Sequence, residues 1–406
     1  MAFTLHDERI PVWGTPDAGA VEQIVRCAQD AQYAALMADH HLGYAVPVGG
    51  VVAYDHHISP SGVGYDIACG NKAVRLDLSA ADLRRDIGTI MDEIWSNLSF
   101  GVGRVNSEEV DHELFDDDAW SQLEVPDRTS LKDKARRQLG TIGSGNHYVD
   151  LFVDERERVW VGVHFGSRGF GHRIATHYIT AGGGSDGMQV KPVLLDVDSD
   201  LGRGYLLAME LTGRYAYAGR DWVCGKVASL LGAAIEEEVH NHHNFGWREE
   251  HDGRQLWVVR KGATPAFPGQ KGFVGGSMGD TSVILRGAQG GDVASSDEAR
   301  RSLYSTVHGA GRVMSRRQAA GKTRWDKKRR RRVVVRPGAV SRAMMMEWVR
   351  ERGVELRGAG TDESPHCYKR ISDVLAAHAA TIEVLHTLRP LGVAMAAADE
   401  HDPYRD

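Results

Sequence analysis

The sequence predicts an α+β fold formed by one large unit that spans residues 1–406. Three observations support this prediction. Some segments carry apolar residues at helical spacing, whereas others are short and rich in β-branched residues. No Gly/Ser-rich or Pro-rich linker and no repeat of fixed period divides the chain. With 42% hydrophobic and 26% charged residues, the composition is that of a globular protein with a sizeable core.

The predicted elements follow from these two kinds of periodicity. Helices are expected where Ala, Val, Ile and Leu recur every three or four residues, and strands where β-branched residues alternate with others. In chain order, the expected helices are 17–37, 80–98, 201–238 and 368–388, and the expected strands are 71–78, 159–166, 255–260 and 282–287. The acidic stretch 108–120 is expected to be a surface excursion. We expect the glycine-rich loops between the elements to converge on one site.

The charge distribution is uneven. The net charge of −6 argues against a protein coated for non-specific nucleic-acid binding. Nevertheless, Lys327, Lys328 and Arg329 to Arg332 form one basic run within 322–336. The run is either a solvated loop or a contact to an RNA or DNA backbone.

The cysteines and the hydropathy indicate a cytoplasmic protein. Four widely spaced cysteines form no CxxC pair, so neither a disulfide framework nor a zinc ribbon is indicated; they are Cys27, Cys69, Cys224 and Cys367. The sequence begins with no signal-peptide pattern, and no stretch approaches the roughly 20 apolar residues of a membrane span. We therefore expect no association with a membrane.

The segment "VHGAGRVMSR" places His308 before a glycine and two arginines. If a helix starts after Gly309, Arg312 and Arg316 lie on one face and can hold phosphate oxygens near the helix N-terminus. His308 would then be a candidate nucleophile. The alternative is a packed histidine beside a solvated basic face.

Four segments carry side chains suited to a metal. The segment "GVGYDIACG" supplies Asp66 and Cys69, and "GSGNHYVD" supplies Asn146 and His147. The segment "VGVHFGSRGFGH" supplies His164 and Arg168. The segment "EEVHNHHNFGW", expected at the end of a long helix, supplies His240, His242 and His243. A thiolate, a carboxylate and imidazoles suit Mn²⁺, Fe²⁺, Co²⁺ or Zn²⁺ better than Mg²⁺. The set is large enough for two ions.

A further glycine-rich block, residues 258–287, contains Arg260 and Lys261 at a strand end. Small residues permit close backbone approach to a ligand, and Lys261 would supply charge to a phosphate. The block has neither the spacing of a P-loop nor that of a Rossmann fingerprint.

Taken in order, the motifs "GVGYDIACG", "GTIGSGNHYVD", "HFGSRGFG", "HN", "RKGATPA", "GGSMGDTS", "HGAGRVMSR" and "SPHCYK" resemble those of the RtcB family of RNA-splicing ligases. The resemblance covers about residues 37–395. It implies an RtcB-like unit around a metal-lined cleft, in which RNA 3′-phosphate or 2′,3′-cyclic phosphate ends are joined to 5′-hydroxyl ends with GTP and two Mn²⁺ ions. It also implies that His308 becomes guanylylated, that RNA and GTP are partners, and that an archease-type activator is a candidate partner.

The resemblance also implies roles for individual residues. Asp66, Cys69 and His147 would bind one Mn²⁺, and Cys69, His164 and His240 the other. Phosphates of nucleotide or RNA would be held by Arg168, Lys261, Arg312 and Arg316. The GTP or GMP site would comprise Asn146, His147, Tyr148, Asp150, His240, Asn241, Gly275, Gly276, Ser277, Met278, Ser282, His308, Gly309, Ala310, Gly311, Tyr368 and Met395.

Two positions depart from the family pattern. Asp150 stands where the family has a glutamate that reads the guanine edge, and Met395 stands where it has a lysine. The metal and nucleophile positions remain intact, so the resemblance supports catalysis better than guanine selectivity. Two alternatives stay open: a metal-dependent RNA phosphodiesterase that has lost ligation, and a non-catalytic metal-bound RNA-binding protein.

Overall fold

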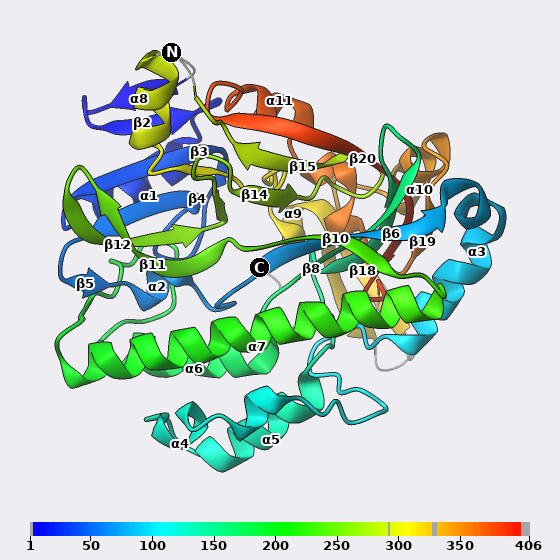
Figure 1. Cartoon of the computed structure of the whole chain (residues 1–406), viewed down its shortest axis with the longest axis horizontal. Helices are drawn as coiled ribbons and strands as arrows, with labels where there is room; N and C mark the ends of the chain where they lie inside the picture. The colour runs from blue at the N-terminus through cyan, green and yellow to red at the C-terminus, as the bar shows by residue number, and fades with distance from the viewer. Residues whose placement is uncertain (1–2, 291–292, 327–330, 399–406) are drawn as a thin grey trace.

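The computed structural model describes residues 3–290, 293–326 and 331–398. Two sheets lie side by side, and helices pack around them (Figure 1). The predicted α+β class is confirmed; the extent of the single domain, residues 1–406, stays a prediction. Among the described residues, none of the helices combines the length and the hydropathy that a transmembrane span requires.

The N-terminal part of the chain builds most of the first sheet. Except for the parallel β2–β3 pair, its neighbouring strands are antiparallel. Within the described residues its order is β1 (Phe3–His6), β2 (Ile10–Trp13), β3 (Tyr33–His41), β4 (Val48–Tyr54), β12 (Arg254–Lys261) and β11 (Asn244–His251).

The second sheet is assembled from strands far apart in the sequence. Its order is β10 (Ile235–His242), β6 (Gly70–Ser79), β8 (Arg158–Phe165), β7 (Tyr148–Val153), β20 (Ile382–Met395), β15 (Ser282–Gly287) and β14 (Lys271–Val274), and β19 (Glu355–Arg357) pairs with β20. Three further pairs are β5 (His57–Ile58) with β9 (Leu195–Asp196), β13 (Ala263–Pro265) with β16 (Ser305–Val307), and β17 (Gly321–Asp326) with β18 (Arg331–Pro337).

The helix α7 (Asp200–Leu230) packs into two of the hydrophobic clusters that form the core. It begins at a cap in which the Ser199 side chain accepts from the Gly202 N–H. Its first half contributes Tyr205 and Tyr215 to one hydrophobic cluster, and its second half contributes Val223 to another. Because both clusters depend on one rigid helix, the loops at the ends of the two sheets keep a fixed relation.

The other helices lie around the sheets. They are α1 (Ala18–Ala28), α2 (Pro60–Val63), α3 (Ala80–Asn97), α4 (Ala119–Gln122), α5 (Arg128–Gln138), α6 (Arg168–Ala181), α8 (Val293–Arg301), α9 (Arg316–Ala320), α10 (Arg342–Glu351) and α11 (Ile371–Ala376), with 3₁₀ turns at Glu113–Asp116, Thr361–Glu363 and Pro365–Cys367. In Figure 1, α6 lies next to α7, and α4 and α5 form a layer beyond them.

Five predicted elements are confirmed, and three predicted helices are too long. The expected strands 71–78, 159–166, 255–260 and 282–287 are β6, β8, β12 and β15, and the expected helix 80–98 is α3. The helices predicted over 17–37, 201–238 and 368–388 are wrong in their C-terminal parts, which form β3, β10 and β20. These parts pair with neighbouring strands, and this tertiary pairing overrides the local helical pattern.

Two predictions about charged segments have mixed outcomes. The acidic stretch 108–120 lies on the outer layer, but it is anchored by Phe115 and Trp120, which are buried. Residues 327–330 of the basic run lie outside the described residues. Its role as a nucleic-acid contact therefore stays a prediction.

Candidate active site

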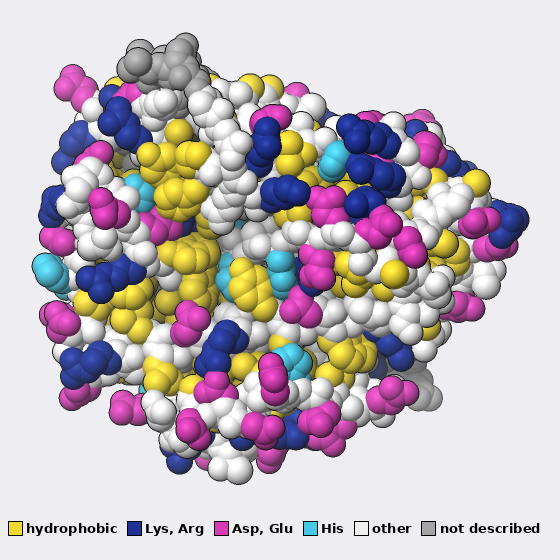
Figure 2. Space-filling view, viewed as in Figure 1, with side chains coloured by type: hydrophobic (Ala, Val, Ile, Leu, Met, Phe, Trp, Pro, Cys, Tyr) yellow, Lys and Arg dark blue, Asp and Glu magenta, His cyan; other side chains and the backbone are white. Residues whose placement is uncertain are grey.

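A cavity of about 1150 Å³ lies where loops from both sheets meet. It is large enough for a nucleotide together with the end of a polynucleotide. Near the centre of the face in Figure 2, histidine side chains reach the surface next to hydrophobic ones, with acidic and basic side chains interspersed around them. The predicted convergence of glycine-rich loops is thus observed in the structure.

Four side chains in this cavity form a candidate metal centre. The Sγ of Cys69 lies 3.2 Å from Nε2 of His164 and 3.7 Å from Nε2 of His147. The same Nε2 of His147 lies 3.1 Å from a carboxylate oxygen of Asp66. All donor atoms of the Cys69, His147 and His164 group lie within 4.8 Å of one another. The donor set therefore fits a soft or borderline divalent cation.

Backbone carbonyls set the orientation of the two imidazoles. Nδ1 of His147 lies 3.1 Å from the Ile142 carbonyl, and Nδ1 of His164 lies 3.2 Å from the Asn146 carbonyl. A carbonyl can only accept, so Nδ1 of each ring donates. Nε2 of His164 then keeps its lone pair toward Cys69. Nε2 of His147 also faces the Asp66 carboxylate, which can only accept, so this nitrogen would present its lone pair once a cation displaces the proton.

The protonation of the centre depends on a cation. Burial and the neighbouring Asp66 raise the pKa of the Cys69 thiol well above its usual value. Burial would also raise the pKa of Asp66, but the hydrogen bond and charge of His147 outweigh it, and the pKa falls to about 2. Asp66 is therefore ionised, while Cys69 would release its proton when a metal binds.

A further histidine beside this cluster is His243, which was predicted to lie at the end of a long helix. It lies in the turn between β10 and β11, and its N–H donates to the Cys69 carbonyl at 2.9 Å. Its ring centroid is 5.1 Å from that of His164 and 4.8 Å from that of His308. Among the described residues its buried Nδ1 has no hydrogen-bond partner. His243 thus bridges the metal centre and His308.

His240, which the resemblance assigned to the second metal, is not brought to the Cys69 cluster. Its Nε2 accepts from Nε of Arg220 at 2.7 Å, and its Nδ1 lies 3.4 Å from Asp221. Both ring nitrogens are therefore engaged elsewhere. The motif "HNHHN" contains two His-Asn pairs three residues apart, and the second pair, which follows β10, is the one that lines the cavity.

Arg220 is a fully buried cation that ties the walls of the site together. Its guanidinium donates to the carbonyls of Ala68 at 3.0 Å and Phe165 at 2.6 Å, in addition to His240. These carbonyls belong to the Asp66–Cys69 loop and to the end of β8. Arg220 is thus a positioning residue for Cys69 and His164, and nothing in the sequence pattern singled it out.

His308 is held by a carboxylate that the sequence analysis did not consider. Its Nδ1 lies 2.6 Å from Oδ2 of Asp39, and the same oxygen accepts from the backbone N–H of His308 at 3.0 Å. Asp39 is completely buried on β3; burial would raise its pKa, but the charge and hydrogen bonds of His308 lower it below its usual value. The ionised Asp39 fixes the ring of His308 with Nδ1 as donor, so that Nε2 is the unprotonated nitrogen.

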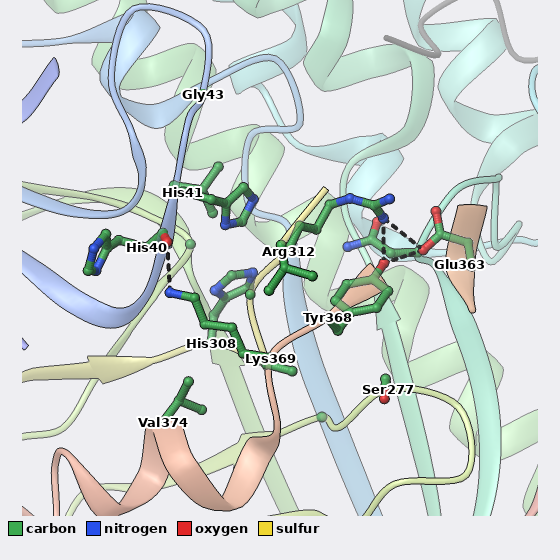
Figure 3. A pocket seen from close by; sticks show the side chains of 18 of the residues that line it. His40, His41, Gly43, Ser277, His308, Arg312, Glu363, Tyr368, Lys369 and Val374 are labelled. Atoms are coloured by element: carbon green, nitrogen blue, oxygen red, sulfur yellow. Dashed lines mark hydrogen bonds and ion pairs between the residues drawn. The ribbon is translucent and has the colours of Figure 1, made fainter. Parts of the chain in front are cut away.

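Arg312 and Arg316 belong to a partly buried network, in which Figure 3 shows Arg312 with Tyr368 and Glu363. No helix starts directly after Gly309, because α9 begins only at Arg316. Arg312 donates to the Tyr368 hydroxyl at 2.9 Å, and Arg316 pairs with Glu363. Their side chains are only 15% and 17% exposed, which excludes the solvated basic face. Both line the cavity.

Most of the remaining predicted residues also line the cavity. Those that do are Lys261, Asn146, Tyr148, Asp150, Gly275, Gly276, Ser277, Met278, Gly309, Ala310, Gly311, Tyr368 and Met395. Five of the predicted residues do not line it. His240 and His242 both contact the Arg220 guanidinium, the guanidinium of Arg168 lies 3.3 Å from Nδ1 of His147, Ser282 accepts from the Gly276 N–H, and Asn241 accepts from the Phe273 N–H. Asn244 lines the cavity where Asn241 does not.

Glycines permit the close approaches in this site. Gly262 has φ +64°, and a Cβ there would lie 3.0 Å from the His308 ring. A Cβ on Gly275 would lie 2.1 Å from the Tyr148 hydroxyl. The glycines of these motifs therefore leave room for the side chains that form the cavity wall.

The α+β fold and the buried donor cluster beside a carboxylate-bound histidine define a candidate metal-dependent enzyme. A family model described as tRNA-splicing ligase RtcB matches residues 21–396. The chain is 32% identical to the tRNA-splicing ligase RtcB of Archaeoglobus fulgidus, over 92% of this chain and 90% of that protein. It is 30% identical to the protein of that name from Thermococcus kodakarensis, over 89% of this chain and 87% of that protein.

It is also 29% identical to the RNA-splicing ligase RtcB of Escherichia coli K12, over 95% of this chain and 97% of that protein. The chain therefore belongs to the RtcB family of tRNA-splicing ligases. This membership supports an RNA ligase and an RNA substrate.

Proposed function

We propose that this protein is a GTP- and Mn²⁺-dependent RNA ligase that joins RNA 3′-phosphate or 2′,3′-cyclic phosphate ends to 5′-hydroxyl ends through a His308-guanylate intermediate. The observation that carries the proposal is the placement of His308, which is held by Asp39 on one side and lies next to His243 of the metal centre on the other. A histidine that lines a nucleotide-sized cavity and keeps an unprotonated Nε2 is the arrangement that a histidine nucleophile needs.

The metal centre would consist of Asp66, Cys69, His147, His164 and His243, with Cys69 central to it. When bound, divalent cations would neutralise charge on the phosphates. The thiolate and imidazole donors suit Mn²⁺ among other transition metals, and the family supplies the preference for Mn²⁺. His240 is replaced in this proposal by His243, because Arg220 engages Nε2 of His240.

The reaction would proceed in three steps. Nε2 of His308 attacks the α-phosphorus of GTP, a P–N bond forms, and pyrophosphate leaves; Asp39 keeps the proton on Nδ1 and stabilises the charge on the ring. An oxygen of the RNA 3′-phosphate then takes the guanylate from His308. Finally the 5′-hydroxyl attacks the activated phosphate, and GMP leaves with the bonding electrons. A cyclic phosphate end would first be opened by water.

Several basic side chains would hold phosphates in these steps. Lys261 is buried, and burial lowers its pKa to about 8; its Nζ donates to the carbonyls of Tyr44 at 2.6 Å and Val46 at 3.0 Å. Arg312 and Arg316 offer guanidiniums at the opposite wall, and Arg168 supports the centre from behind His147. Tyr368 would contact the base. Cytoplasmic location and an archease-type activator stay predictions.

The geometry favours ligation over the two alternatives. A phosphodiesterase needs metal ions and a water, and an RNA-binding protein needs neither metal ions nor a nucleophile. Neither requires a buried aspartate that sets the tautomer of a histidine in the cavity. The His308–Asp39 pair is thus the feature that separates the ligase from both.

The function is tested by joining two labelled RNAs. We expect the protein to seal a 3′-phosphate strand to a 5′-hydroxyl strand when both GTP and Mn²⁺ are present, and not when either is omitted. Gel electrophoresis of the products measures the sealed fraction. Conversion of a 2′,3′-cyclic phosphate end without any sealing would identify a phosphodiesterase, and binding without any conversion would identify a non-catalytic protein.

Selectivity for GTP over ATP is expected to be weaker than the family pattern implies. Burial raises the pKa of Asp150 well above its usual range, and its Oδ1 has no partner among the described residues. A neutral carboxyl offers one donor and one acceptor, which matches the adenine edge, whereas the guanine edge presents donors that require a carboxylate. Met395, packed with Tyr148 and Met278, adds no polar contact.

The measurement compares covalent labelling by GTP and by ATP. We expect Asp150→Glu, alone and combined with Met395→Lys, to raise the GTP/ATP ratio by about tenfold, because each added bond to a charged group is worth about 1.5 to 3 kcal/mol. The single variant controls for the cost of placing a lysine among methionines. Strong preference for GTP in the unmodified protein, unchanged in both variants, would mean that another residue reads the base.

A further inference from the structure

An unassigned group of aromatic and basic side chains leads outward from the cavity. We call it the mouth strip, and define it as Tyr44, Tyr65, His172, Lys134 and Arg173. The Tyr65 ring lies 6.3 Å from that of Tyr44, edge to face, and 5.3 Å from that of His172, stacked at 28°. These contacts join the loop after β3, the loop before β6 and helix α6.

Two residues of the mouth strip, Tyr44 and Tyr65, adjoin the candidate active site. Tyr44 lines the cavity, is 38% exposed, and accepts from Lys261 through its backbone carbonyl. Tyr65 directly precedes Asp66 of the metal centre, and its hydroxyl donates to Asp186, which sets the orientation of the ring. A chain that leaves the cavity on this side therefore passes the Tyr44 ring first.

Basic side chains continue the mouth strip onto α5 and α6, which pack together. A Cβ on Gly169 would lie 3.2 Å from the Lys134 Nζ, which places this ammonium one residue from Arg168 at the start of α6. Burial is the largest cause that lowers the pKa of His172. The charges of Lys134 and Arg173 lower this pKa further and the charge of Asp66 raises it, so these groups lie near the His172 ring. Lys134 and Arg173 are exposed and form no ion pair within the described part of the chain.

We propose that the mouth strip binds unpaired RNA nucleotides next to the end being joined, with a base stacked on Tyr44 and phosphates held by Lys134 and Arg173. Aromatic rings interleaved with cations are the usual platform for single strands, because every base has a face that stacks and every nucleotide has a phosphate. A duplex cannot stack its paired bases on a side chain. The inference rests on the proposed function, because it takes RNA as the substrate.

Affinity for a fluorescent single-stranded oligoribonucleotide with a 3′-phosphate, measured by anisotropy over a series of NaCl concentrations, tests the mouth strip. We expect Tyr44→Leu to bind about tenfold more weakly and Tyr44→Phe to bind normally, because the ring carries the stacking. We expect Lys134→Ala/Arg173→Ala to bind more weakly and to reduce the slope of log K against log[salt] by about 1.4, or about 0.7 for each phosphate contact.

A matched pair of charge removals serves as the control. Arg9→Ala/Arg300→Ala removes two exposed arginines at the β1–β2 turn and on α8, at the opposite end of the molecule from α5 in Figure 1, and is expected to bind RNA normally. Thermal unfolding of every variant verifies that it is folded. Unchanged affinity and salt slope in the Lys134/Arg173 variant, or equal binding of a blunt RNA duplex by the unmodified protein, would overturn the proposal.

The proposed function is tested separately by labelling the unmodified protein with GTP in the absence of RNA. Absence of labelling together with strip-dependent RNA binding would refute the ligase mechanism and retain the mouth strip. Labelling of the protein, together with RNA binding that is unchanged in the mouth-strip variants, would support the ligase mechanism and refute the mouth strip.

Discussion

Replacing His308 with alanine is expected to abolish covalent labelling by α-labelled GTP and all RNA joining, a loss of at least about a thousandfold. The variant removes the nitrogen that would form the P–N bond. The neighbouring His243 ring lies 5.1 Å from that of His164 in the metal centre, and both ring nitrogens of His240 are engaged by Arg220 and Asp221. Electrophoresis of the labelled protein measures the loss.

Asp39→Asn provides the graded comparison. The amide keeps the shape of the buried side chain but removes the charge that stabilises the His308 ring as the P–N bond forms. We expect labelling to fall by about a hundredfold or more while metal content is unchanged, as for a residue that orients a catalytic histidine. Labelling of the His308→Ala protein at the wild-type rate would place the nucleophile elsewhere and refute the proposed intermediate.

Local pattern predicted the elements that keep one hydrophobic periodicity. The segments that became β6, β15 and α3 each do so, and their neighbours did not need to be known. The three overextended helices each contain a break that sequence alone did not weigh. Gly232, with φ +63°, separates α7 from β10, for example. Beyond that break the chain forms strand pairs, whose partners are distant in sequence.

The same limit explains the errors in the site. His308, Cys69, His147 and His164 could be proposed from their motifs, because each lies in a glycine-rich loop or at a strand end. Choosing between His240 and His243 required the register of β10, which decides which side chain faces Cys69.

Asp39 was missed for a related reason. The expected helix ended just before it, and its partner lies 269 positions away in the sequence. An aspartate followed by two histidines after an apolar run was the signal available in "LMADHH".

Replacing Cys69 with serine is expected to remove the bound metal and, with it, both labelling and joining. The thiol lies within 3.7 Å of two imidazole Nε2 atoms, so it is the donor common to the whole centre. A serine hydroxyl does not ionise at neutral pH and binds Mn²⁺ or Zn²⁺ far more weakly than a thiolate. Elemental analysis after loading with MnCl₂ and desalting measures the metal content. Cys224→Ala, in the core of α7, is the control and is expected to retain its metal.

The same measurement decides between the two histidines. We expect His243→Ala to lose metal and His240→Ala to retain it, because the His243 ring lies against that of His164, whereas Nε2 of His240 is engaged by Arg220. Metal binding should also weaken as pH falls, because the raised pKa of Cys69 makes a proton the competitor of the cation. If Cys69→Ser keeps its full metal content, Cys69 is not a ligand. If His240→Ala loses metal while His243→Ala keeps it, His240 binds the ion. In that case the side chains around Arg220 must rearrange when the metal binds.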